Sequence, residues 1–185
     1  MNDRTTALIC GSGPMFFTHL ARAQRIVPDA ALIGVNLTGL FLRDVRHLVS
    51  LHADVLGPLR ALRATCDWVR RDAPEPETHA PHADLGVDRV WPLPPAGPAG
   101  TSALFAVWVA LGLGYARVIL VGVPMDNGGR FFDPPGATVW PHQDDQPAWT
   151  QAAREWFDGR VRSMTGWTRV LLGAPAEILE EERAA

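Results

Sequence analysis

The chain has 185 residues, of which 47% are hydrophobic, and a formal net charge of −3. This length and composition predict one globular domain over residues 1–185 and exclude a disordered chain. The acidic balance argues against a nucleic-acid partner, which would require a basic face. All 17 basic residues are arginine, which also excludes a phosphate-binding lysine of the Walker type.

The sequence indicates neither a membrane partner nor a disulfide. No apolar run reaches the roughly 18 residues that span a bilayer, and the start, MNDRTT, lacks the order of a secretory signal. The two cysteines, Cys10 and Cys66, do not form a CxxC pair, so we expect neither a disulfide framework nor a structural zinc site. We therefore expect a cytoplasmic protein.

The first half of the chain alternates short apolar runs with helical patterns. The predicted strands are residues 7–10, 30–36 and 48–52. The predicted helices are residues 16–25, where apolar side chains recur every three or four positions, and residues 54–64. We expect the second helix to be interrupted near Gly57 and Pro58.

The second half continues this alternation around two irregular stretches. Residues 73–100 are rich in proline and polar residues and predict a surface excursion with one short strand, DRVWPL. Residues 124–148 predict a long loop over the candidate site. The regular elements are an all-round apolar helix over 101–114, a strand over 116–123, a helix over 149–164 and a strand over 168–172. Such alternation predicts an α/β fold with a mainly parallel sheet.

Polar residues and glycines follow the predicted strands at the points where the strands end. The carboxyl ends of parallel strands share one edge of a sheet, and ligands of such folds bind there. We therefore expect one site that includes the start of the 101–114 helix. Its residues are Gly11, Ser12, Gly13, Asn36, His52, Thr101, Ser102, Gly122, Pro124 and Asp126.

The stretch GSGP, residues 11–14, is typical of a bend that holds an anion. Glycine lets a ligand approach the backbone amides, and the helix that follows presents unpaired N–H groups. The stretch is not a full dinucleotide fingerprint, because Phe16 replaces the third glycine and Asn36 stands where an acidic residue would bind a ribose. A plain strand-to-helix turn is the alternative.

Several site residues also have structural explanations, which stay open at this point. Asn36 fits a contact with a base or ribose and equally a turn. Thr101 and Ser102 fit helix capping as well as a phosphate contact. Asp126 fits a carboxylate that faces the site or one that forms a turn before NGG, and His52 fits a ligand contact or a rim histidine with its own partners.

The loop over 124–148 is longer than most connections, which is typical of a lid or a functional segment. His142 lies beside carboxylates in this loop and is a candidate general base, while Trp140 is a candidate for covering a sugar or base. The HQDD stretch matches no strong ligand spacing, so we predict no metal site. The histidines expected at the surface are His19, His47, His79 and His82.

The order of four segments resembles a Rossmann-like superfamily. The segments are ALICGSGPM, IGVN, VSLH and GTSALFAVWVALGLGYARVILVGVPMD. The superfamily includes bacterial sialyltransferases, motility-accessory-factor glycosyltransferases and archaeal 6-hydroxymethylpterin pyrophosphokinases, and small phage and prophage proteins carry similar segments. The resemblance implies a Rossmann-like three-layer sandwich that binds a nucleotide.

The resemblance also implies roles for individual residues. Those that match the nucleotide contacts of the sialyltransferases are Gly11, Ser12, Gly13, Asn36, Thr101, Ser102, Gly122 and Pro124. The general-base histidine of that family follows the last of these strands, which makes His142 its positional counterpart. His52 and Trp140 are then the candidates for contacting the substrate.

We therefore expect a nucleotide-binding transferase, with glycosyl transfer from a nucleotide-sugar donor as the first hypothesis. His142 or Asp126 would remove the proton of the acceptor hydroxyl. Transfer of pyrophosphate to a small alcohol is an alternative, which would need Mg²⁺ held by Asp126. A non-catalytic phage or prophage nucleotide-binding protein is a further alternative. Beyond the nucleotide no cofactor is predicted, and the apolar helix leaves room for a homo-oligomer.

Overall fold

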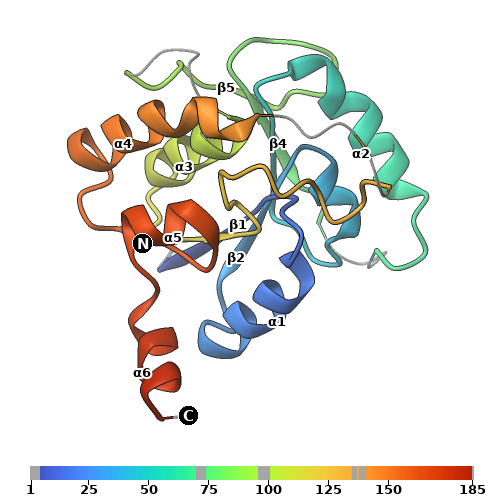
Figure 1. Ribbon diagram of the computed structural model, residues 1–185. Helices are drawn as coiled ribbons and strands as arrows, with labels where there is room; N and C mark the ends of the chain where they lie inside the picture. Colours follow the sequence, from blue (N-terminus) through green and yellow to red (C-terminus); the bar gives the residue numbers. More distant parts are fainter. Residues whose placement is uncertain (1–4, 70–73, 96–100, 135–136, 138–140, 185) are drawn as a thin grey trace.

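A parallel sheet forms the centre of the protein (Figure 1). The computed structural model describes residues 5–69, 74–95, 101–134, 137 and 141–184. In these residues seven strands pair in the order β5-β4-β3-β2-β1-β6-β7, and every pairing is parallel. The strands are β1 (Thr6–Cys10), β2 (Ala31–Val35), β3 (His47–Val49), β4 (Glu77–Ala80), β5 (Arg89–Val90), β6 (Arg117–Val121) and β7 (Val161–Ser163). The predicted α/β class with a parallel sheet is confirmed.

Helices cover both faces of this sheet and make three layers (Figure 1). One face packs against α1 (Phe16–Ile26), α2 (Leu56–Ala64) and α6 (Ala176–Ala184). The other packs against α3 (Ser102–Gly112) and α4 (Gln146–Glu155), beside which lies α5 (Gly166–Leu172). Short 3-10 helices complete the chain: η1 (Asn36–Phe41), η2 (Ala53–Val55) and η3 (His142–Asp145). Strands covered on both faces must be apolar throughout, which explains the uninterrupted runs of β1 and β6.

The helix α3 is buried on nearly all sides, as its composition predicts. Side chains from Ala103 to Val107 are at most 8% exposed, and the helix contacts β1, β2, β3 and β6. Thr101 caps it, since its Oγ1 accepts a hydrogen bond from the Leu104 amide at 3.3 Å. This cap fixes where the helix begins, directly beside the carboxyl ends of the central strands.

The order of the strands creates a switch point at the centre of the sheet. From β1 the chain adds β2, β3, β4 and β5 on one side, and then crosses back to place β6 on the other side of β1. The chain therefore leads from β1 to α1 on one face of the sheet and from β6 to α4 on the other. In open parallel sheets a crevice forms at this position, and it is where ligands bind.

The predicted excursion over residues 73–100 is partly wrong, because it contains two strands of the sheet. The short strand expected in DRVWPL is β5, whereas β4 was not predicted. Its sequence, ETHA, contains no apolar run that would indicate a strand. Polar side chains can be buried in this strand because neighbouring residues form hydrogen bonds with them. Thr78 Oγ1 donates to Gly86 O at 2.6 Å, and His79 Nδ1 accepts from Trp91 Nε1 at 3.0 Å. His79 and His47, expected at the surface, are fully buried here.

The predicted elements after β6 are also corrected. The helix expected over 149–164 ends at Glu155, because Asp158 (φ 49°) and Gly159 (φ 67°) turn the chain into β7. The strand expected over 168–172 is the helix α5, in which Trp167 and Leu171 pack on the core, whereas Val170 is 85% exposed. Trp167 and Leu171 are four positions apart and share one face, as in a helix. The five-residue run 168–172 is too short for this spacing to be recognised in the sequence.

The helix α2 is not interrupted, contrary to expectation. Gly57 and Pro58 lie in its first turn, where the missing N–H of proline costs no helical hydrogen bond. Across the described residues, every helix is too short or too polar to traverse a bilayer.

Candidate functional site

A cavity of about 590 Å³ lies at the carboxyl edge of the sheet, at the switch point between β1 and β6. Its volume is within the range of small-molecule sites, roughly 300–1,000 Å³. Every predicted site residue that the structure describes lines it, namely Gly11, Ser12, Gly13, Asn36, His52, Thr101, Ser102, Gly122, Pro124, Asp126 and His142. Trp140 lies outside the described residues. The expected convergence of these segments on one crevice is thus observed.

The glycines of the cavity floor allow two loops to pack backbone against backbone. The Gly11 amide donates to Val121 O and the Gly13 amide to Gly122 O, both at 2.8 Å. A Cβ atom on Gly11 would lie 2.6 Å from Gly122 O, and one on Gly13 would lie 2.7 Å from Pro124 Cδ. Glycine is therefore required here by the contact between the loops that follow β1 and β6.

The start of α1 is covered by aromatic side chains. The Phe131 amide donates to Ser12 O at 2.8 Å, and its ring stacks on Phe16 with the ring centroids 5.1 Å apart. Phe41 contacts the same ring edge-on. Gly11 to Gly13 line the cavity, but the first residues of α1 do not. The geometry thus disfavours the start of the 16–26 helix as the anion-binding end.

The start of α3 opens on the cavity instead. Thr101, Ser102 and Ala103 all line it. The amides of Ser102 and Ala103 have no acceptor among the described residues, as is usual in the first turn of a helix. Ser102 Oγ accepts from the Leu51 amide at 3.1 Å, which ties this turn to the segment after β3. Two free amides and the positive end of a buried helix make this the favoured position for an anion.

Three side chains that line the cavity hold a buried polar atom without a partner in the described part of the chain. They are Asn36 Oδ1, Thr38 Oγ1 and His142 Nδ1. Asn36 adopts φ 50°, a left-handed conformation that asparagine tolerates better than most residues. Buried polar groups are nearly always hydrogen-bonded, so these three atoms are polar groups of the cavity lining that the described structure leaves unsatisfied. Thr38 was not predicted, since nothing local marks it.

Arg63 holds the segment that carries Asn36 and Thr38. Its side chain is 4% exposed, and its guanidinium donates to the carbonyl oxygens of Gly39, Leu42 and Arg43. These carbonyl groups lie at the end of η1 and just after it, outside the hydrogen bonds of the sheet. The guanidinium of Arg63 from α2 supplies their hydrogen-bond donors. Arg63 is therefore a positioning residue for the wall of the cavity.

We expect the Arg63→Met variant to lose about 2–3 kcal/mol of unfolding free energy, because buried carbonyls would lose a charged donor. Urea unfolding followed by circular dichroism measures this loss. Arg25→Met is the matched control, since Arg25 is exposed at the end of α1. Equal stabilities of the two variants would contradict the role of Arg63.

His142 and Asp126 both lie at the loop side of the cavity. Burial lowers the pKa of His142 below its ordinary value of 6.5, an effect reinforced by Arg130 and opposed by Asp145 and Asp126. The imidazole is therefore neutral near pH 7 and able to accept a proton. Asp126 Oδ1 accepts from the Gly128 amide at 3.0 Å, so the predicted turn forms while the residue also lines the cavity. Gln146 Nε2 donates to Met125 O at 2.8 Å and anchors the end of this loop.

Arg130 is a site residue that sequence reasoning missed. It is the only arginine among the described residues that line the cavity, and its guanidinium lies 5.8 Å from the centre of the Phe132 ring. The signal was indirect: in a chain without lysine, a cationic phosphate contact must come from arginine. Within the described part of the chain, Arg130 supplies the one permanent positive charge of the cavity lining, which also includes the carboxylates of Asp54 and Asp126.

Part of the cavity lining is apolar and exposed. Leu37 from η1, Val55 from η2 and Leu62 from α2 line it and are 48%, 36% and 53% exposed. Large exposed aliphatic side chains that share a concave surface are typical of a binding site. The cavity lining therefore combines apolar side chains with amide donors, an arginine and a neutral histidine.

Comparison with protein-family models, with curated proteins and with solved structures gave no match to this chain.

Proposed function

We propose that this protein binds a nucleotide-sugar in the cavity and transfers the sugar to an acceptor hydroxyl. The observation that carries the proposal is that exposed apolar side chains and groups suited to binding an anion line the same cavity. A base or other flat apolar group fits against Leu37, Val55 and Leu62, while phosphate oxygens fit the amides of α3 and the Arg130 guanidinium. A nucleotide-sugar has both parts in one molecule.

The residues of the cavity supply each step of such a transfer. His142 accepts the proton of the acceptor hydroxyl, and the hydroxyl oxygen forms a bond to the anomeric carbon of the sugar. The bond between that carbon and the phosphate oxygen breaks, and its electron pair leaves with the nucleotide. Arg130 and the free amides of Ser102 and Ala103 stabilise the added negative charge. Asn36, which is partly exposed at the cavity, offers a polar contact to the base or ribose.

The binding part of the proposal is tested by thermal shift against nucleotides and nucleotide-sugars. A ligand at a hundred times its Kd is expected to stabilise the wild type by about 2.7 kcal/mol. Arg130→Gln should weaken binding about tenfold, because one charge-assisted contact is lost. Arg25→Gln is the control, since it makes the same change away from the cavity.

The outcomes of this screen separate the alternatives. Stabilisation that requires Mg²⁺ would favour phosphoryl transfer, with Asp126 near the metal. Binding of nucleotides without turnover of any nucleotide-sugar would favour a non-catalytic binding protein. If no nucleotide shifts the melting temperature, the proposed function is wrong.

A further inference from the structure

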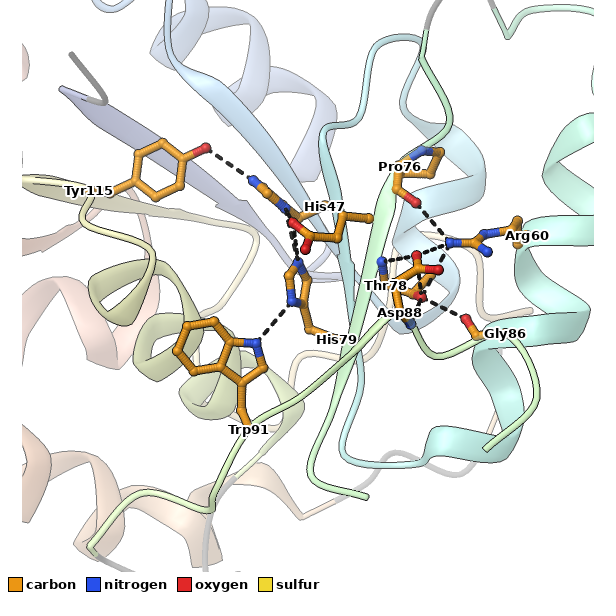
Figure 2. Close-up of polar contacts among 10 residues, drawn as sticks. His47, Arg60, Pro76, Thr78, His79, Gly86, Asp88, Trp91 and Tyr115 are labelled. Atoms are coloured by element: carbon orange, nitrogen blue, oxygen red, sulfur yellow. Dashed lines mark hydrogen bonds and ion pairs between the residues drawn. The ribbon is translucent and has the colours of Figure 1, made fainter. Parts of the chain in front are cut away.

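A second polar cluster is buried between the sheet and α3, and none of its members lines the cavity (Figure 2). His47 is the first residue of β3 and pairs in register with Glu77, the first residue of β4. His79 lies two residues further along β4, so all three side chains project from the same face. His47 and His79 are 2% and 0% exposed, whereas the Glu77 side chain is 39% exposed.

The hydrogen bonds around the two histidines determine which nitrogen carries each proton. Trp91 Nε1 can only donate, so His79 Nδ1 accepts from it at 3.0 Å and carries no proton. His79 is then neutral with its proton on Nε2, which donates to His47 Nδ1 at 2.9 Å. His47 in turn carries its proton on Nε2 and donates to Tyr115 Oη at 3.2 Å. Figure 2 shows this chain from Trp91 through both imidazoles to Tyr115.

The same two imidazole nitrogens and one carboxylate oxygen form a compact triangle. Glu77 Oε2 lies 3.5 Å from His47 Nδ1 and 3.5 Å from His79 Nε2, and the two nitrogens are 2.9 Å apart. A point in the plane of these atoms is about 1.9 Å from all three, so an ion slightly above the plane reaches the 2.0–2.2 Å typical of zinc bound to nitrogen and oxygen. The separations of the three ligand atoms are therefore compatible with one shared ion, which would replace the hydrogen bond between the two imidazoles.

We propose that His47, Glu77 and His79 form a binding site for a divalent transition-metal ion of the zinc class. Two imidazoles and one carboxylate are a donor set that such ions prefer over Mg²⁺ or Ca²⁺. Tyr115 accepts the hydrogen bond of His47 Nε2–H and so fixes the tautomer in which Nδ1 carries no proton and can bind a metal. The partly exposed Glu77 gives solvent access to the site and room for a water as fourth ligand.

Trp91 competes with the metal in this arrangement. An ion at His79 Nε2 takes the place of the proton there, and neutral His79 then carries its proton on Nδ1, with no proton lost overall. That N–H would face the Trp91 indole N–H, and two donors cannot bond. The indole, which packs tightly against Gly112 of α3, must therefore break its hydrogen bond when the metal binds. Trp91 lowers the metal affinity of the site and ties metal binding to a movement of the segment after β5.

The experiment titrates the full chain, freed of metal by a chelator, with ZnCl₂ by calorimetry and with CoCl₂ by visible absorption. We expect one ion per chain and a cobalt spectrum of nitrogen and oxygen ligands. Trp91→Phe removes the competing donor and should tighten metal binding about tenfold. This factor corresponds to the hydrogen bond between Trp91 and His79 that the wild type must break when the metal binds. Glu77→Gln should weaken binding at least tenfold.

Two variants serve as controls. Trp68→Phe removes another indole N–H, which bonds to Leu40 O away from this segment, and should leave the affinity unchanged. His82→Gln removes an exposed histidine and should also have no effect. Circular dichroism of each variant establishes that it is folded. Absence of stoichiometric binding in both the wild type and Trp91→Phe would overturn the site, and so would equal binding by Glu77→Gln and the wild type.

Discussion

The Gly122→Ala variant is expected to lose about 2–5 kcal/mol of unfolding free energy, a large part of the stability of a typical domain. Gly122 adopts φ 65°, and a Cβ atom there would lie 2.6 Å from Gly11 O and 3.1 Å from Phe16 Cδ2. The left-handed conformation costs about 1–2 kcal/mol, and a clash with backbone that cannot move away adds about 1–3 kcal/mol. Chemical denaturation followed by circular dichroism measures the sum.

Gly159→Ala separates the two contributions to this loss. Gly159 has nearly the same φ, 67°, but no atom lies within 4 Å of a Cβ placed there. This variant should therefore lose only the conformational part, about 1–2 kcal/mol. Equal losses at Gly122 and Gly159 would show that the loops after β1 and β6 do not pack as described, and the floor of the cavity would then need revision.

The His142→Gln variant is expected to reduce sugar transfer between 100- and 10,000-fold, the usual contribution of a general base. This prediction rests on the proposed function. Nucleotide affinity should change little, because the base contacts the acceptor hydroxyl rather than the phosphates. Steady-state rates together with thermal shift give both quantities, and His82→Gln is the control for removal of an exposed histidine. Full turnover by His142→Gln would exclude the role of this residue.

The pH dependence of turnover follows from the same imidazole. Its neutral form accepts the proton, and burial lowers its pKa below 6.5. The rate should therefore approach a plateau toward neutral pH and fall in acid, with a midpoint below pH 6.5. Asp145 raises the pKa of His142, so Asp145→Asn should move that midpoint further down. A midpoint above 6.5, or one that Asp145→Asn moves upward, would contradict the assignment.

The two proposals concern different ends of the same sheet and fail independently. The cavity depends on the carboxyl edge, where the loops after β1 and β6 meet the start of α3. The histidine cluster depends on the pairing of β3 with β4 and on Tyr115, which precedes β6. A metal-binding result therefore neither supports nor weakens nucleotide binding.

The sequence by itself determined the class of the fold and most of the cavity. Uninterrupted apolar runs at β1, β2 and β6 indicate strands covered on both faces, and strands of that kind pair in parallel. Parallel pairing brings all carboxyl ends to one edge, so residues that follow different strands, such as Gly11, Asn36 and Gly122, meet without any local signal. Thr101 was recognisable as a cap because capping is a local interaction.

Only the tertiary structure decided the elements and contacts that depend on distant neighbours. The strand β4 is polar in sequence, and it exists because His47, Trp91 and Asp88 satisfy its buried side chains. The run 168–172 is a helix because it packs beside β7 and α4 and does not add an eighth strand to the sheet. The covering of α1 by Phe131, on which our proposal of α3 as the anion-binding end rests, arises from a loop more than 100 residues away. Burial and hydrogen-bond satisfaction are set by such long-range contacts, which periodicity along the chain does not contain.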